Sequence, residues 1–221
     1  MNEREIWNKL REAGLTEIAT AAIMGNMKAE SAMKANNLQN SYEKKLGYTD
    51  EKYTELIDKG IYDRDKFVHD SAGYGLCQWT HWSRKNDLFT FWLQRDFLTS
   101  IGDTAMQVDF CIWELKNKYA AVWRDVNEEK MITGATAIIL RRYERPADQS
   151  DANVKRRSEM AEAFYDAYKG PEEVPSISIP CTNLESIRNK VKMIQETLDK
   201  TTLFIDEAIE HLEYVMEDLT E

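Results

Sequence analysis

Apolar residues recur at helical spacing near the start of the chain. Ile6, Trp7 and Leu10 fall on one face of residues 3–13, and Gly14 follows directly. An apolar stripe that ends at a glycine is typical of an amphipathic helix. The pattern therefore predicts a helix over residues 3–13.

Similar signals continue as far as residue 169. Thr16 is a suitable N-cap for a second helix over residues 17–29. A third helix is expected to open at Asp103 or Thr104, and two further helices are expected over residues 134–143 and 152–168. Alternating strand patterns are scarce, although the glycine-rich residues 72–79 suit a small β-hairpin. The sequence thus predicts a mainly α domain.

The composition changes at Gly170. Residues 170–183 hold three of the four prolines, and all six tryptophans come earlier. In residues 184–221 apolar side chains repeat every seven positions, at Leu184, Val191, Leu198, Ile205, Leu212 and Leu219, with Ile187, Ile194, Thr201, Ala208 and Val215 between them. We therefore expect a helical domain over residues 1–169, a linker over 170–183 and a coiled-coil helix over 184–221.

A single coiled-coil helix leaves its apolar stripe uncovered. Residues 184–221 are therefore expected to form a homo-oligomer or to dock on a partner helix; the alternative is an amphipathic helix that folds back on the main domain. From Asn183 onward the chain has ten acidic and four basic residues. This charge argues against a helix that lies on a membrane surface.

Charge and composition exclude several classes of partner. The chain has 221 residues and a net charge of -10, with no basic block for a nucleic acid. It has no apolar stretch of the roughly 20 residues that a membrane span needs. The charged N-terminus does not resemble a signal peptide, so we expect synthesis in the cytoplasm without a secretory signal.

Glu30 is the first candidate for chemistry. It stands at the end of the small-residue helix AAIMGNMKAES and is followed by Ser31. Cleavage of a glycosidic bond needs a partly desolvated carboxylic acid that protonates the leaving oxygen. The end of an apolar helix can hold such a group at the lip of a cleft; a solvated surface glutamate is the alternative.

The second candidate is the run HDSAGYGLCQWTHWSR, residues 69–84. Its glycines let the backbone approach a sugar, Gln78 offers an amide, and Tyr74 and Trp79 offer aromatic faces. A turn with core aromatics is the alternative. Cys77 would suit a cysteine peptidase but more simply packs as a small apolar residue.

No cofactor is expected from the remaining groups. The histidines form no cluster with spacing for a metal, and the three cysteines are odd in number and far apart. We expect reduced thiols and no metal site.

Three motifs together carry a resemblance to a known family. Residues 29–31 (Ala-Glu-Ser), residues 73–79 (GYGLCQW) and residues 143–146 (Tyr-Glu-Arg-Pro) resemble the phage tail lysozyme family, within the lysozyme and lytic-transglycosylase superfamily. The resemblance covers approximately residues 3–169. It implies a lysozyme-like helical domain that cleaves the glycan strands of peptidoglycan.

The resemblance also implies roles for single residues. Glu30 would be the general acid, and the substrate-binding residues would be Ser31, Tyr74, Gln78, Trp79 and Tyr143. Animal lysozymes of the hen type have an Asp directly before the Tyr-Gly pair, where this chain has Gly73. Asp70, three residues earlier, is either the base that positions a water opposite Glu30 or a turn-capping residue.

We therefore expect a glycoside hydrolase, an N-acetylmuramidase-like lysozyme of phage origin that acts on the bacterial cell wall as an endolysin or a virion component. Two alternatives stay open. One is a lytic transglycosylase, in which the 6-hydroxyl of the sugar replaces water. The other is a non-catalytic phage tail or wall-binding module.

Overall fold

A computed structural model of the chain describes residues 1–95 and 99–170, together with positions 192 and 202. Contacts divide the chain into two units, Met1–Gly170 and Pro171–Glu221. The expected linker and coiled-coil helix lie outside the described residues, apart from Gly170, Lys192 and Thr202.

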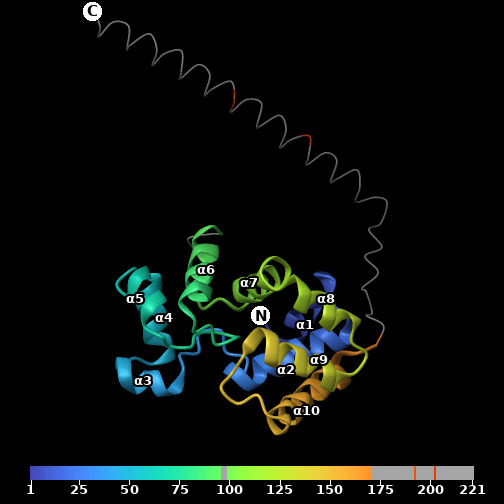
Figure 1. Cartoon of the computed structure of the whole chain (residues 1–221). Helices are drawn as coiled ribbons and strands as arrows, with labels where there is room; N and C mark the ends of the chain where they lie inside the picture. Colours follow the sequence, from blue (N-terminus) through green and yellow to red (C-terminus); the bar gives the residue numbers. More distant parts are fainter. Residues whose placement is uncertain (96–98, 171–191, 193–201, 203–221) are drawn as a thin grey trace, which may run out of the picture. The chain divides into compact units, whose positions relative to one another are not determined.

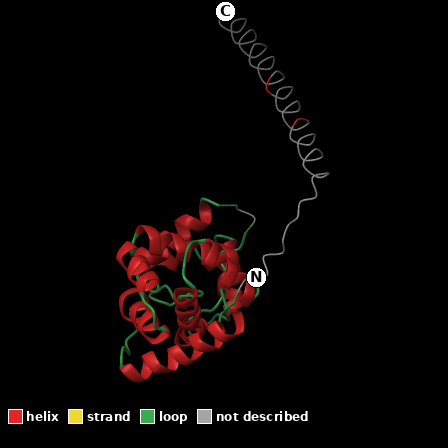
Figure 2. Ribbon diagram, turned by 90° about the vertical axis from the view of Figure 1, so that its right-hand side faces the viewer, coloured by secondary structure: helices red, strands yellow, loops and turns green. Residues whose placement is uncertain are grey.

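The described part of the first unit is built from helices, with no strand among its residues, as Figure 2 shows. This confirms the predicted fold class. The helices are α1 (Glu3–Glu12), α2 (Glu17–Ser31), α3 (Asn40–Leu46), α4 (Asp50–Asp58), α5 (Arg64–His69), α6 (Trp82–Leu93), α7 (Thr104–Asn117), α8 (Ala120–Glu128), α9 (Ile132–Ile138), the π-helix η1 (Ile139–Glu144) and α10 (Asp151–Tyr168).

Capping side chains mark the starts of α2 and α7, which the sequence predicted. The Thr16 side chain accepts a hydrogen bond from the Ala19 amide, and Asp103 caps α7 in the same way through Met106. These side-chain acceptors satisfy amides that the first turn leaves without a partner. Gly14 follows α1 with φ +103°, a conformation that favours glycine.

Helix α2 runs through the middle of the domain and is buried along most of its length. Its closest neighbour is α10, and Gly25 is the point of contact. A Cβ atom at Gly25 would lie 2.7 Å from Ala161 Cβ and 2.8 Å from the Arg157 carbonyl oxygen. Only glycine permits this approach, which brings the C-terminal half of α2 against α10 (Figure 1).

The glycine-rich residues 72–79 form a tight turn and not a hairpin of two strands. The Tyr74 and Trp79 backbones exchange hydrogen bonds of 3.2 and 3.0 Å, and Leu38 pairs with Tyr74 on the other side. Gly75 and Gln78 complete the turn with φ values of +78° and +45°. The expected hairpin is thus reduced to single bridges.

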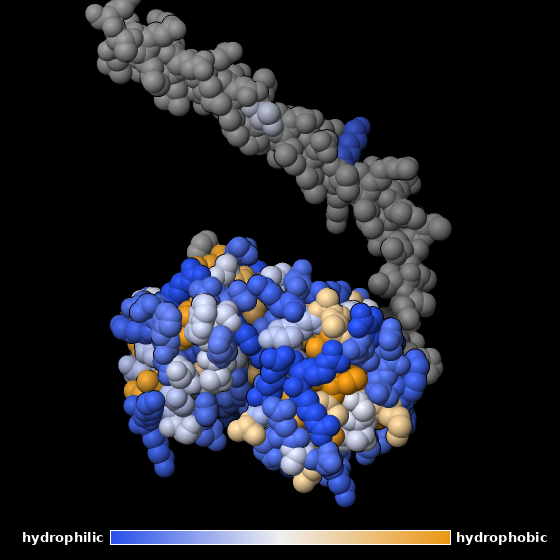
Figure 3. Space-filling model, viewed as in Figure 1, coloured by the Kyte–Doolittle hydropathy of each residue, from blue (hydrophilic) through white to orange (hydrophobic). Residues whose placement is uncertain are grey.

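Helices α3, α4 and α5 form a second side of the domain that the sequence analysis did not predict. Tyr53, Tyr62, Phe67 and Tyr74 pack there ring against ring, with centroids 5.2 to 6.3 Å apart. Aromatic pairs at these separations stabilise a small core. In Figure 1 these helices lie opposite α9 and α10, and Figure 3 shows a hollow between the two sides.

Candidate active site

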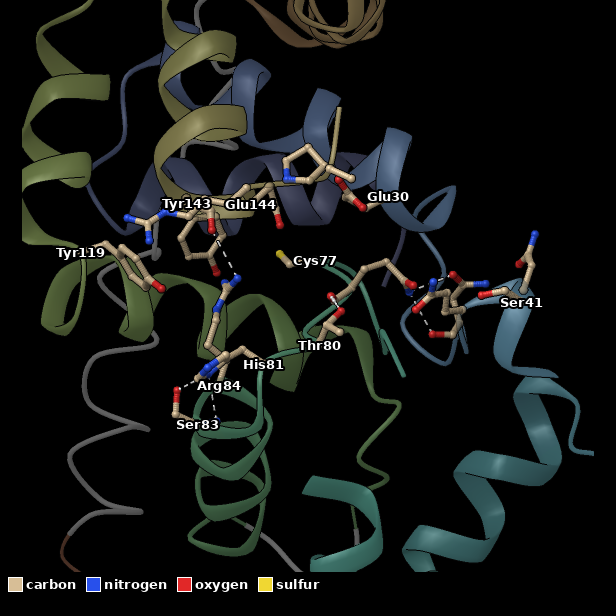
Figure 4. A pocket seen from close by; sticks show the side chains of 17 residues that line it. Glu30, Ser41, Cys77, Thr80, His81, Ser83, Arg84, Tyr119, Tyr143 and Glu144 are labelled. Carbon is tan, nitrogen blue, oxygen red and sulfur yellow. Dashed lines mark hydrogen bonds between the residues drawn. The ribbon is translucent and has the colours of Figure 1, made fainter. Parts of the chain in front are cut away.

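A cleft of about 1120 Å³ lies between these two sides of the domain. One wall comes from α2 and from the end of η1 with the loop after it, and the other from residues 37–41, the 72–79 turn and the start of α6. Figure 4 shows the side chains that converge on it. Most of the residues that line it have polar side chains: Glu30, Asn37, Gln39, Asn40, Ser41, Cys77, Gln78, Thr80, His81, Ser83, Arg84, Tyr119, Tyr143, Glu144, Arg145, Pro146 and Ala147.

Glu30 lines this cleft from the last turn of α2, with its side chain 17% exposed. Its Oε1 atom accepts a hydrogen bond of 2.5 Å from Arg157 Nη2, and the same guanidinium donates to Asn26. The Arg157 side chain is 4% exposed. Helix α10 therefore fixes the direction of the Glu30 carboxyl through one buried arginine.

Glu144 is a second carboxyl in the cleft. It ends η1, just before Arg145 turns the backbone at φ +52°. Figure 4 shows Glu144 and Glu30 directed into the same space. Burial raises the pKa of Glu144 well above its ordinary value, and the nearby charge of Glu30 raises it further.

Glu144 and Arg145 are neighbours in the Tyr-Glu-Arg-Pro motif, but they do not form an ion pair with each other. Within residues 1–95 and 99–170, Glu144 has neither a hydrogen bond nor an ion pair, and Arg145 donates instead to the Arg142 carbonyl oxygen. The Glu144 carboxyl is thus a polar group aimed into a cleft with no protein partner. A signal for it was available, because Glu144 belongs to the Tyr-Glu-Arg-Pro motif.

Gln78 forms part of the opposite wall. Its amide donates to the Asn37 carbonyl and side-chain oxygens at 3.1 and 2.9 Å, which holds the left-handed backbone at this position. Gly73 has to be small here, because a Cβ atom would lie 2.7 Å from Gln78 Oε1. Backbone strain of this kind is commonly found at ligand-binding sites.

A buried hydrogen-bond network supports the floor of the cleft. The Glu114 carboxylate, 1% exposed, accepts two hydrogen bonds of 2.7 Å from Arg84. It also accepts one from Trp79 Nε1 and one from the Tyr143 hydroxyl. The Glu114 carboxylate thus binds three side chains at once, and it holds Arg84 and Tyr143 in fixed orientations at the cleft.

Four of the expected site residues do not line the cleft. Tyr74 and Trp79 are fully buried: the Tyr74 hydroxyl pairs with Thr54, and Trp79 packs on Phe110. Ser31 is buried too, and its hydroxyl donates to the Met27 and Leu76 carbonyl oxygens. Their polar atoms satisfy the protein and not a sugar, which corrects our expectation for all three.

Asp70 is the fourth expected site residue that does not line the cleft. It forms a buried ion pair with Lys85 at 2.5 Å, with the two side chains 4% and 0% exposed. The Tyr53 and Tyr62 hydroxyls also donate to it. Of the two roles considered for Asp70, the structure has the turn-capping one: its Oδ1 atom accepts a hydrogen bond of 2.8 Å from the Ala72 amide, and its carboxylate does not stand opposite Glu30 in the cleft.

Cys77 lies in the cleft wall but is 2% exposed. Burial and contact with Cys111 raise the pKa of the Cys77 thiol well above its ordinary value. A thiol of this kind stays protonated, which argues against a cysteine nucleophile.

Among the residues that the structure describes, no group of three or more His, Cys, Asp or Glu side chains is arranged to hold a metal ion. None of the helices described is long and apolar enough to cross a membrane.

A helical domain whose cleft is lined by two carboxyls has the arrangement that glycan-cleaving enzymes use. The family comparison then specifies it. A model of the family described as phage tail lysozyme matches residues 1–168, and the chain belongs to this family. It is a peptidoglycan-cleaving enzyme. The search of curated proteins found no match.

Proposed function

We propose that the protein is a muramidase-type hydrolase of phage origin that cleaves the glycan strands of peptidoglycan with Glu30 as general acid. The observation that carries this proposal is the position of Glu30 in the wall of a cleft of about 1120 Å³, opposite Gln78. A groove of this kind accommodates an extended saccharide. Its polar lining suits sugar hydroxyl and acetamido groups.

In this proposal the position of each residue in the cleft decides its role in the reaction. Glu30 protonates the oxygen between N-acetylmuramic acid and N-acetylglucosamine while the bond to C1 breaks. Arg157 holds the Glu30 side chain in one direction, and Gln78 and Asn37 present amide groups to the saccharide. Removal of one such positioned acid typically lowers the rate by about 10²- to 10⁴-fold.

Glu30→Gln tests this role. We expect the variant to lose peptidoglycan cleavage while its thermal unfolding stays close to that of the wild type. The matched control is Glu159→Gln, because Glu159 is exposed on α10 and does not line the cleft. Full activity of Glu30→Gln would contradict the assignment.

A lytic transglycosylase is the second candidate, and the placement of Asp70 favours it. With Asp70 paired to Lys85 inside the core, the base expected from the sequence does not face the cleft. In a transglycosylase the 6-hydroxyl of the muramyl sugar attacks C1 and leaves an anhydro product. Mass spectrometry of digested peptidoglycan separates the two: reducing ends indicate hydrolysis, and anhydro-muramyl ends indicate transglycosylation. Binding to peptidoglycan with neither product would indicate a non-catalytic wall-binding module.

We also propose that residues 184–221 associate with copies of themselves or with a partner helix. The support is the heptad pattern of the sequence. Synthesis in the host cytoplasm and action on the wall as an endolysin or virion component belong to the same proposal. No membrane or nucleic-acid partner is part of it.

A further inference from the structure

The geometry points to a second catalytic residue. We propose that Glu144 is the base of this cleft, which takes the proton of the attacking hydroxyl while Glu30 protonates the leaving oxygen. This inference rests on the proposed function, because it assigns a role in the same reaction.

The first support is the position of Glu144. It lines the cleft together with Glu30, the two carboxyls come from different elements, and both are directed into the same space in Figure 4. Glu144 has no hydrogen bond or ion pair with any described residue, whereas Asp70 and Glu114 are fully engaged in the core. Of these three carboxyls beyond Glu30, Glu144 is therefore the one positioned to meet a substrate.

The second support is the contrast between the two cleft carboxyls. The Arg157 guanidinium holds the Glu30 carboxyl through a hydrogen bond of 2.5 Å, whereas no described residue holds the Glu144 carboxyl. Burial and the neighbouring Glu30 raise the pKa of Glu144 well above its ordinary value, so this carboxyl has the high proton affinity that a base requires.

The charged and titratable groups around Glu144 come from every neighbouring element. They are Glu30 on α2, Arg84 on α6, Cys111 on α7, Arg157 on α10 and Cys77 in the 72–79 turn. Burial and Glu30 raise the pKa of Glu144, while Arg84 and Arg157 act in the opposite direction. The net effect is a rise, so the carboxyl keeps its proton at a higher pH than an exposed glutamate.

The reaction sequence then balances. The reactive form has a proton on Glu30 and none on Glu144. Glu30 donates its proton to the glycosidic oxygen as the C1–O bond breaks. The attacking oxygen, from water or from the sugar's 6-hydroxyl, bonds to C1 and releases its proton to Glu144. Transfer of that proton from Glu144 to Glu30, directly or through water, restores the reactive form.

Three variants of the full chain test this role: Glu144→Gln, Glu144→Asp and Glu30→Gln, with Glu159→Gln as control. Initial rates on purified peptidoglycan are measured from pH 4 to 9, and thermal unfolding is recorded for each. The wild type should give a bell-shaped profile, because the rate needs one proton on the pair. Glu144→Gln should lose about 10²-fold in rate and lack the acid limb, since one carboxyl has one proton to lose.

Glu144→Asp separates a base from a neutral structural group. A base requires a carboxyl, so Asp should be more active than Gln and should retain both limbs. A residue needed only as a neutral side chain would be replaced better by the isosteric Gln. Equal or higher activity of Glu144→Gln, or an unchanged profile in that variant, would overturn the proposal. Activity in Glu30→Gln would instead overturn the proposed function itself.

Discussion

At the scale of single residues, Lys85 is a charged group held inside the aromatic core. Its side chain is fully buried and donates to Asp70, to the Ala72 carbonyl oxygen and to the Tyr53 hydroxyl. These bonds connect the start of α6 to the residues that precede the glycine-rich turn. Lys85 therefore fixes one wall of the cleft without lining it.

Lys85→Met should destabilise the fold by about 3–5 kcal/mol, because it leaves the Asp70 charge buried without its cation. Urea unfolding at pH 7 measures this. Lys85→Met combined with Asp70→Asn should recover part of the loss. A single variant as stable as the wild type would show that the ion pair contributes little.

The same pair predicts a pH dependence. Burial lowers the pKa of Lys85 to about 8 despite the attraction of Asp70, whereas an unfolded lysine titrates near 10.4. Above pH 8 the unfolded chain thus binds more protons than the folded one, and the lysine's contribution to stability rises with pH. The free energy of unfolding of the wild type, minus that of Lys85→Met, should therefore grow between pH 7.5 and 9.5. A constant difference over this range would contradict the lowered pKa.

At the scale of elements, the packing of α2 against α10 decides the geometry of Glu30. Gly25 allows the two backbones to approach, and Arg157 on α10 then reaches the carboxyl at the end of α2. The π-helix η1 likewise sets the position of the second cleft carboxyl, Glu144. Its wider turn ends with a hydrogen bond from the Arg145 amide to the Leu140 carbonyl oxygen, and Glu144 is the last residue within that turn.

Gly25→Ala should cost about 1–3 kcal/mol in stability, because the new methyl group meets the backbone of α10 and forces the helices apart. Activity should fall as well, since Arg157 moves relative to Glu30. The matched control is Gly134→Ala on α9, where the three atoms nearest to the new methyl group belong to the side chain of Glu129 and not to a backbone. Thermal unfolding and initial rates on peptidoglycan measure both effects. Equal behaviour of the two variants would refute the role of the α2–α10 contact.

At the scale of the whole molecule, the family match and the contacts delimit nearly the same unit. The phage tail lysozyme model matches residues 1–168, and the first unit ends at Gly170. The whole cleft lies within this unit. The acidic heptad segment beyond it contributes no described residue to the cleft.

A chain that ends at Gly170 should therefore unfold at about the same temperature as the full chain and cleave peptidoglycan at a similar rate. Light scattering of the two chains tests the role of the heptads, because self-association would give the full chain a mass several times that of a monomer. Identical monomer masses would remove the self-association proposal and leave docking on a partner.

The sequence by itself determined the local features of this protein. Capping side chains such as Thr16 and Asp103, the glycines and the apolar spacing specify helices over short stretches, and Glu30 at the end of α2 follows from them. The family motifs were also readable without coordinates. They predicted the fold class and identified Glu30, Gln78 and Tyr143, which all line the cleft.

Only the tertiary structure decided which motif residues face the cleft. Tyr74, Trp79 and Asp70 have the right chemistry, but packing turned them into the core, where Thr54, Glu114 and Lys85 satisfy their polar atoms. Glu144, in contrast, lines the cleft, because the π-helix directs its side chain toward Glu30. The direction of a side chain depends on contacts between segments far apart in the sequence, and local patterns carry no information about those contacts.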